Sequence, residues 1–278
     1  MILDIILVFI ALIFLIIASY HDIKTREIPD YISYSLITIA ILFSLIKSIY
    51  FTTFSFIVQS LFGLLVFLLL SFFLYYTKQW GGGDAKLLIA LGASFPVYPE
   101  FLISIFNPNL SLPYLLIFLI NLVIVGSIYA IIYSIVLTLK EKDYLTKNFN
   151  KKYLISLFAF VILLLISLFF PQPFNLLVVV VALLSFYPFL FYYVKLFEKH
   201  FMIKSLPLSK ITEGDWLAKD VFKNKKLILS KNSPGLTLED LKKLKQNKIN
   251  QVTIKYGMPF IPSFLLAFII SMFFGNLF

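Results

Sequence analysis

The stretch Ile5-Ile-Leu-Val-Phe-Ile-Ala-Leu-Ile-Phe-Leu-Ile-Ile17 has no polar side chain, and it lies inside an apolar run that extends from residue 2 to residue 20. A helix that crosses a bilayer needs roughly 20 such residues. Asp4 is the only early charge, so the run lacks the basic segment that begins a secretory signal. The sequence therefore predicts a permanent membrane helix here.

The composition extends this prediction to the whole chain. Hydrophobic residues make up 60% and charged residues 14% of the 278 residues, and the mean hydropathy is +0.95. Soluble domains contain roughly 45–50% apolar and 25% charged residues. Apolar runs separated by short charged loops predict an all-α polytopic membrane protein with about eight transmembrane helices, near residues 2–20, 30–49, 55–76, 85–105, 113–139, 153–170, 174–194 and 258–277.

The basic residues predict the orientation of these helices, because Lys and Arg accumulate in cytoplasmic loops. They occupy the first, third and fifth loops and the segment from Lys195 to Lys255, whereas of the 24 Lys and Arg only Lys47 falls on the opposite side. We therefore expect a multi-pass protein of the cell membrane with both termini external. The net charge of +10 then reflects topology and contact with anionic membrane lipids rather than nucleic-acid binding.

Residues 200–256 form the one stretch that looks water-soluble. They contain alternating strand-like patterns, and Thr237 followed by Asp240 resembles a helix capping box. We predict a transmembrane core at 1–199, a small cytoplasmic α+β domain at 200–256 inserted before the last helix, and a transmembrane helix at 257–278. Because the acids of the small domain are scattered, a structural or substrate-docking role is expected rather than chemistry.

Two segments place ionisable residues at the predicted cytoplasmic ends of membrane helices, where burial of charge is costly and usually functional. They are Ser19-Tyr-His-Asp-Ile-Lys-Thr-Arg-Glu-Ile-Pro-Asp30 and Trp80-Gly-Gly-Gly-Asp-Ala-Lys86. Taken alone, Asp22 is explained equally well as a loop charge paired with Lys24 or Arg26. Asp84 is likewise explained as a helix-capping residue, and the three glycines as the end of the third span.

Considered together, Asp22 and Asp84 favour acid–base chemistry. Two nearby carboxylates can share one proton, so that the ionised one activates water and the protonated one polarises a carbonyl. The chain has no cysteine and two histidines, which excludes thiolate chemistry and argues against a histidine-rich metal site. We expect no metal and no cofactor, although His21 beside Asp22 is also placed to contact a metal or to tune the acid.

The segments Asp22-Ile-Lys-Thr-Arg-Glu-Ile-Pro-Asp30 and Gly81-Gly-Gly-Asp-Ala-Lys-Leu-Leu-Ile-Ala-Leu-Gly92 resemble the two active-site signatures of the type IV prepilin peptidase family. This family includes the archaeal preflagellin peptidases and belongs to the GxGD class of intramembrane aspartyl proteases. Gly257-Met-Pro-Phe-Ile-Pro-Ser-Phe-Leu-Leu-Ala-Phe268 is similar to the last membrane segment of the family.

The resemblance implies an aspartic-type endopeptidase with Asp22 and Asp84 as its catalytic pair and Gly81 and Gly83 as the signature glycines. Its substrates would be prepilin or preflagellin (archaellin) precursors, whose short basic leader is removed at the cytoplasmic membrane face. Bacterial members often also methylate the new N-terminus and many carry a cysteine-rich segment. Because this chain lacks cysteine, we expect an archaeal-type peptidase without methylation.

Neighbouring residues are candidates for shaping the site. Glu27 and Asp30 are placed to attract the basic leader, or else belong to a loop of balanced charge. Lys86 is placed to stabilise ionised Asp84, or else is a cytoplasmic anchor. Gly82 and Gly83, with Gly81, are expected to break the chain and to allow close backbone approach.

Two other classes of function use the same residues. In an ion- or proton-coupled transporter the two aspartates would bind the ion, since broken helices and intramembrane acids also serve transport. Both acids, however, lie near one predicted face rather than at mid-bilayer, and the two halves show no convincing repeat. A non-catalytic assembly factor for a pilus or secretion machine leaves two intact acids unexplained.

Overall fold

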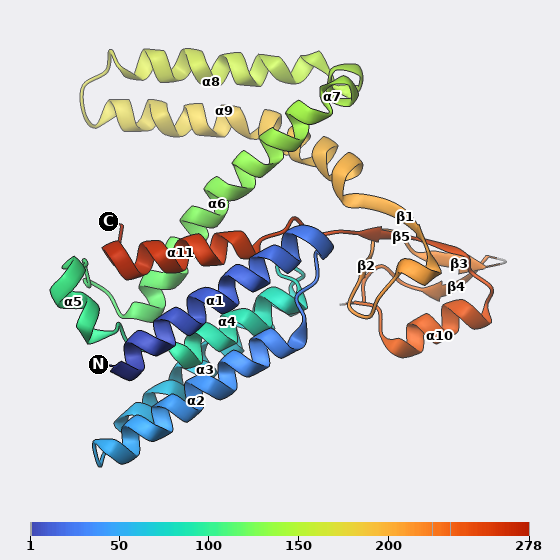
Figure 1. The fold of residues 1–278 in the computed structure, drawn as a ribbon. Coiled ribbons are helices and arrows are strands. Elements are labelled where there is room, and N and C mark those ends of the chain that lie inside the picture. The colour runs from blue at the N-terminus through green and yellow to red at the C-terminus, as the bar shows by residue number, and fades with distance from the viewer. Residues whose placement is uncertain (1, 224, 234, 278) are drawn as a thin grey trace. The chain divides into compact units, whose positions relative to one another are not determined.

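The computed structural model describes residues 2–223, 225–233 and 235–277 of the chain. Its contacts divide the chain into two compact units, one formed by Met1–Ile132 with Leu206–Phe278 and the other by Tyr133–Ser205. Helices make up most of both units, and the strands of a small sheet region fall within residues 203–255 (Figure 1). The predicted class, a helical chain with a small α+β region, is confirmed at this level.

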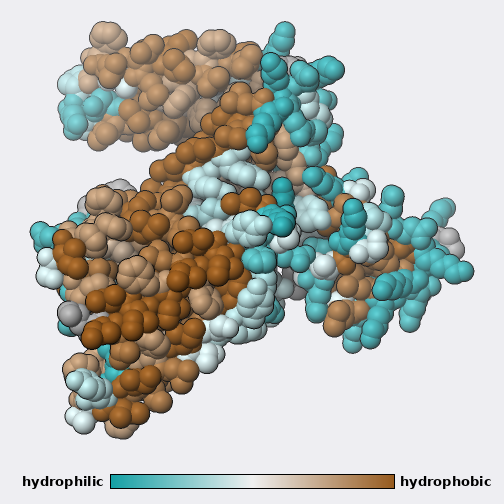
Figure 2. All heavy atoms as spheres, in the orientation of Figure 1, coloured by the Kyte–Doolittle hydropathy of each residue, from teal (hydrophilic) through white to brown (hydrophobic). Residues whose placement is uncertain are grey.

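Five helices in the described part of the chain are long and apolar enough to cross a membrane. They are α1 (Ile2–Thr25), α2 (Asp30–Tyr50), α3 (Ser55–Tyr76), α6 (Tyr114–Lys140), and the segment Phe174–Met202, which comprises α9 (Phe174–Phe197) and the π-turn η2 (Glu198–Met202). Their surfaces carry large apolar side chains, which Figure 2 shows in brown over the helices. Lipid solvates such surfaces, and the chain is a multi-pass membrane protein.

The other three predicted spans correspond to shorter helices. These are α4 (Gly82–Ser94, 13 residues), α8 (Leu154–Ser167, 14 residues) and α11 (Ile261–Phe274, 14 residues). At 1.5 Å per residue each is about 20 Å long, against a hydrocarbon core of roughly 30 Å. The predicted span at 85–105 is not one helix, because the chain leaves α4 before Pro96 and begins α5 (Glu100–Phe106) after Pro99.

The centre of the first unit is α4. Eight of its 13 residues are buried, including Leu87 and Leu88 at 0% exposure. They pack with buried residues of α1, α2, α3, α6 and α11 in one apolar core. A helix surrounded by protein satisfies its own backbone and needs no contact with lipid, so the short length of α4 is compatible with a position inside a helical bundle.

Small residues and hydroxyl groups join α4 to α3. Gly63 and Gly92 lie so close that a Cβ atom on Gly92 would approach the Gly63 carbonyl oxygen within 2.5 Å. The Ser60 hydroxyl donates to the Ala93 carbonyl at 2.7 Å, and the Ser71 hydroxyl donates to the Ala85 carbonyl at 3.0 Å. Close backbone approach at glycine and interhelical hydrogen bonds are typical of helix packing in membranes.

The second unit continues α6 through α7 (Lys142–Asn148) and the 3₁₀ turn η1 (Lys151–Tyr153) into α8 and α9. The last two helices run side by side and are joined by a short connection (Figure 1). His200 and Glu141 are 2.6 Å apart (Nε2 to Oε2), and His200 stacks on Tyr144. These contacts hold the ends of α6 and α9 together within this unit.

The small sheet region contains β1 (Ile203–Pro207), η3 (Leu208–Lys210), β2 (Trp216–Leu217), β3 (Val221–Lys223), β4 (Lys226–Leu229), α10 (Leu238–Gln246) and β5 (Gln251–Lys255). Its strands form one sheet in the order β1-β5-β2 and a β3-β4 pair. The predicted capping box is confirmed, because the Thr237 hydroxyl accepts from the Asp240 N–H and the Asp240 carboxylate accepts from the Thr237 N–H. Apolar residues including Leu244 and Ile254 form a separate small core.

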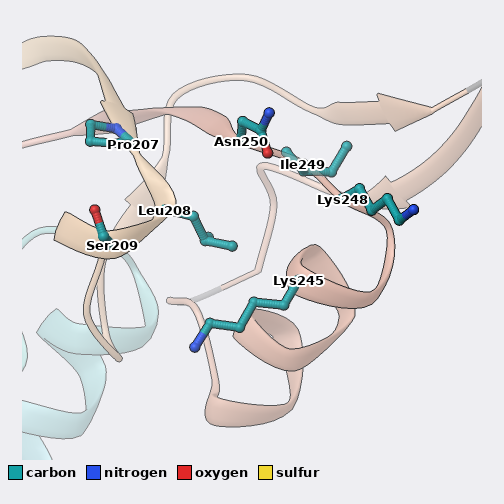
Figure 3. Close-up of a pocket in the computed structure, with 7 residues that line it drawn as sticks. All are labelled: Pro207, Leu208, Ser209, Lys245, Lys248, Ile249 and Asn250. Atoms are coloured by element: carbon teal, nitrogen blue, oxygen red, sulfur yellow. The ribbon is translucent and has the colours of Figure 1, made fainter.

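An open pocket lies beside this core (Figure 3). It is bounded by the turn after β1 and by the end of α10 with the residues that follow, and its lining consists of Pro207, Leu208, Ser209, Lys245, Lys248, Ile249 and Asn250. None of the predicted site residues lines it. Asp22 and Asp84 are thus not part of this pocket.

Candidate active site

Asp22 lies in the last turn of α1, which continues to Thr25, and its side chain is buried at 6% exposure. Its Oδ2 atom accepts a hydrogen bond from the Ile261 backbone N–H at 2.8 Å, and the Phe260 backbone N–H also donates to the carboxylate. These two residues form the N-terminus of α11. The first amides of a helix lack partners within the helix and favour negative charge, so the start of α11 is suited to hold this carboxylate.

Asp84 is the third residue of α4, and its Oδ2 atom accepts from the Gly81 backbone N–H at 3.0 Å. This is the capping contact that the sequence allowed. The carboxylate of Asp22 lies near enough to interact electrostatically with the carboxylate of Asp84. The structure thus brings together the end of α1 and the starts of α4 and α11, each contributing a carboxylate or the amides that hold one. Capping and proximity to a second carboxylate occur together at Asp84.

The sequence predicted that the three glycines would together break the chain between two helices, and this prediction is wrong for two of them. α3 ends at Tyr76, and α4 already begins at Gly82, so only Gly81 stands outside a helix. Gly83 has a packing role, because a Cβ atom there would lie 2.8 Å from Ile28 Cδ1 and 3.1 Å from Ile28 Cβ. A Cβ atom on Gly82 would only touch Tyr75 at 3.7 Å. Gly83 therefore allows the first turn of α4 to approach the loop between α1 and α2.

Lys86 pairs with Asp30 at 2.5 Å between Nζ and Oδ1, and it also lies over the Tyr34 ring. The observed partner of Lys86 is thus Asp30 rather than Asp84, the partner that the sequence suggested. Both side chains are partly exposed, so the pair contributes about 1 kcal/mol or less. Its geometric effect is to link the start of α2 to the start of α4, beside the two aspartates.

Arg26 and Glu27, in the α1–α2 loop, contact the small sheet region and the residues that follow it. The Thr212 hydroxyl donates to Glu27 Oε1 at 2.8 Å, and Arg26 Nη1 donates to the Gly257 carbonyl at 3.0 Å. Burial raises the pKa of Asp215, the Thr212 backbone N–H opposes this rise, and the nearby charge of Glu27 adds to it. Glu27 thus faces a neighbouring acid and a hydroxyl from the small sheet region.

No group of three or more His, Asp or Glu side chains in the described residues is placed to hold a metal ion. His21 makes an edge contact with the Tyr20 ring. The aromatic ring of Trp80 packs on Phe260 and Phe264 of α11, at 5.9 and 5.4 Å between ring centroids. Asp22, which accepts from the Ile261 amide, is thus held beside a cluster of aromatic side chains at the start of α11.

Residues 9–131, which carry both aspartates and the glycines, match the type IV leader peptidase family. The resemblance of the two sequence motifs to the type IV prepilin and preflagellin peptidases is therefore confirmed.

Among curated proteins, the preflagellin peptidase of Methanocaldococcus jannaschii is 31% identical over 144 residues, which are 52% of this chain and 61% of that protein. The preflagellin peptidases of Methanococcus maripaludis and Methanococcus voltae are 38% identical over 84 residues and 35% identical over 108 residues. These segments cover 30% and 38% of this chain, and 36% and 45% of those relatives. All three matches span less than two thirds of the relatives' lengths, and no solved structure matches the chain.

Phe260 and Ile261 were not predicted from the sequence to belong to the site, although they supply the hydrogen bonds to Asp22. Their contribution comes from backbone amides, which leave no signature in residue type. The segment from Gly257 to Phe268, which resembles the family's last membrane segment, was the one available indication. It marked the start of α11 as distinctive without showing which residue it would contact.

Proposed function

We propose that the protein is a membrane-embedded aspartyl endopeptidase that removes the short basic leader of type IV prepilin-like or preflagellin precursors. The observation that carries the proposal is that Asp22 lies near enough to Asp84 to influence its charge, within the segment that matches the leader peptidase family. The curated relatives are named preflagellin peptidases, so an archaellin-like precursor is the proposed partner together with membrane lipids. No cofactor and no nucleic acid are part of the proposal.

In the proposed mechanism the two carboxylates share one proton between them. The ionised carboxylate removes a proton from a water molecule whose oxygen attacks the scissile carbonyl carbon, while the protonated carboxyl donates to the carbonyl oxygen. The C–N bond then breaks, and the departing amine takes a proton from the pair. The amides of Phe260, Ile261 and Gly81 hold the two side chains in place during these steps.

We further propose eight membrane segments, with α4, α8 and α11 as the short ones, and a site on the cytoplasmic face. One contact supports the arrangement of the first two membrane segments, α1 and α2. Lys47 at the end of α2 pairs with Asp4 at the start of α1, at 2.7 Å between Nζ and Oδ1. Lys47 is the one basic residue assigned to the external side, and an unpaired lysine there would disfavour the proposed orientation of the helices. Its charge is neutralised by Asp4, at the end of α1 that lies opposite Asp22.

The orientation predicts the locations of inserted tags. A tag after Lys147 or within 205–250 is expected to be protected from external reagents, and a tag at Asn109 or at either terminus is expected to be accessible. Accessibility would be measured on intact cells and again after permeabilisation, with the permeabilised sample as the positive control for each tag. An external 205–250 segment would contradict both the eight-span arrangement and the cytoplasmic location of the site.

The activity is tested by incubating membranes that contain the protein with a pilin or archaellin precursor bearing a basic leader. We expect a shortened product that is absent with membranes from cells lacking the protein. A transporter using the same aspartates would leave the precursor intact.

A further inference from the structure

Two neighbouring side chains attach the loop between α1 and α2 to the small domain and to Gly257, the residue that follows it. Glu27 accepts from the Thr212 hydroxyl at 2.8 Å, and Arg26 donates to the Gly257 carbonyl at 3.0 Å. The Arg26 guanidinium also lies over the Tyr256 ring, 5.6 Å from its centroid. Arg26 lies only four residues after Asp22 and adopts a left-handed backbone conformation with φ of 60°. These contacts therefore fix the chain where it leaves the helix that carries Asp22.

The loop between α3 and α4 is attached to the same domain at a different point. Lys78 Nζ donates to the Lys231 carbonyl at 3.0 Å. Lys78 lies in the short connection that leads to Gly81 and Asp84, and its backbone is also left-handed, with φ of 57°. The small domain thus contacts both of the loops that border the two aspartates.

A third connection is covalent. Strand β5 ends at Lys255 in the small domain, and five residues later the chain reaches Phe260 and Ile261, whose amides hold the Asp22 carboxylate. The Ile254 and Val252 side chains of β5 are buried in the core of the small domain, at 0% and 3% exposure. The position of this strand therefore constrains the start of α11 directly.

We propose that the small domain at 206–256 is a positioning element of the active site, which holds the α1–α2 loop, the α3–α4 loop and the start of α11 in one arrangement. This inference rests on the proposed peptidase function and assigns to the domain a role in turnover. Thr212, Arg26 and Lys78 are positioning residues in this account. Each contact is weak because it is exposed, but misplacing a catalytic group by about 1 Å can lower a rate about a hundredfold. The buried residues Leu236 and Leu244 belong to an apolar core of the domain's own, which such a role requires.

The test compares single and double variants of the full-length protein in the precursor-cleavage assay. Thr212→Val removes the hydroxyl donor and keeps the side-chain shape, and Lys78→Gln removes the cation that reaches Lys231. The matched controls are Lys242→Gln, which makes the same change of charge on exposed α10, and Ser209→Ala, which removes an exposed hydroxyl from the same domain. Wild type and both controls are expected to cleave at the same rate.

For the double variant we expect kcat to fall about tenfold or more, with KM changed less than twofold and with normal abundance in the membrane. The position of the domain would be measured independently with spin labels on Tyr76→Cys and Lys242→Cys, since the chain has no native cysteine. We expect the distance distribution between the labels to broaden in the double variant.

Wild-type kcat in a double variant with a broadened distance distribution would overturn the inference, because the domain would then move without effect on turnover. A narrow, unchanged distribution would overturn it as well, because the contacts would not hold the domain. A fall in rate that merely follows protein abundance would reduce the domain to a stability role. Failure of the wild type to cleave would instead reject the peptidase proposal, and the inference with it.

Discussion

Replacing either Asp22 or Asp84 by asparagine is expected to lower the rate of precursor cleavage by at least about 10³-fold. One pair of carboxylates is proposed to carry out every proton transfer, so that neither can act without the other, and such units lose most of their activity with a single member. The fold should survive the change. An asparagine carbonyl can still accept from the Ile261 amide at position 22 and from the Gly81 amide at position 84.

Retention of these hydrogen bonds makes the asparagine variants informative, and alanine variants supply the comparison. Asp84→Ala also removes the cap of α4, which costs about 1 kcal/mol, so it is expected to be less abundant than Asp84→Asn. Cleavage rates would be normalised to folded protein measured in the same membranes. Near-normal turnover by Asp22→Asn or Asp84→Asn would remove the aspartyl mechanism.

The second large effect is expected at Gly83, where alanine should lower turnover up to about a hundredfold with little change in abundance. The added methyl group would meet Ile28 Cδ1 at 2.8 Å and Ile28 Cβ at 3.1 Å. The Ile28 side chain belongs to the loop that follows Asp22, so relief of this overlap shifts one catalytic loop against the other. Errors of position near 1 Å have effects of this size.

Two further variants separate this effect from helix propensity. Gly82→Ala makes the same change one residue earlier in the same turn, but its methyl group meets Tyr75 only at 3.7 Å, so near-normal turnover is expected. Combining Gly83→Ala with Ile28→Ala removes the overlapping atoms beyond Cβ and should restore much of the rate. A wild-type rate per folded molecule for Gly83→Ala would show that Gly83 serves no purpose in positioning.

The sequence was sufficient to predict the parts of the fold that depend on local pattern. The long apolar runs gave α1, α2, α3, α6 and α9, and the spacing of Thr237 and Asp240 gave the start of α10. The two aspartates could be selected as candidates from the sequence, because acids at the ends of membrane helices are unusual and their flanking residues form recognisable motifs.

The lengths of the helices and the interaction partners of side chains were less predictable, because both depend on tertiary packing. Apolar composition continues past the end of α4, and the break before α5 comes from Pro96 and Pro99 rather than from a polar loop. Lys86 is two residues from Asp84 in sequence, yet it pairs with Asp30 from another helix. The hydrogen bond from the Ile261 amide to Asp22 joins residues that are 239 positions apart in the chain. No pattern within either motif encodes such contacts.

The most direct test of the proposed function is the mass of the product formed by the purified protein in liposomes with an archaellin precursor that carries a basic leader. The proposal predicts two fragments that differ from the precursor by one water in total, with the cut just before the hydrophobic helix of the precursor. It also predicts that Asp22→Asn and Asp84→Asn form neither fragment. An intact precursor after prolonged incubation with folded wild-type protein, or equal cleavage by the asparagine variants, would contradict it.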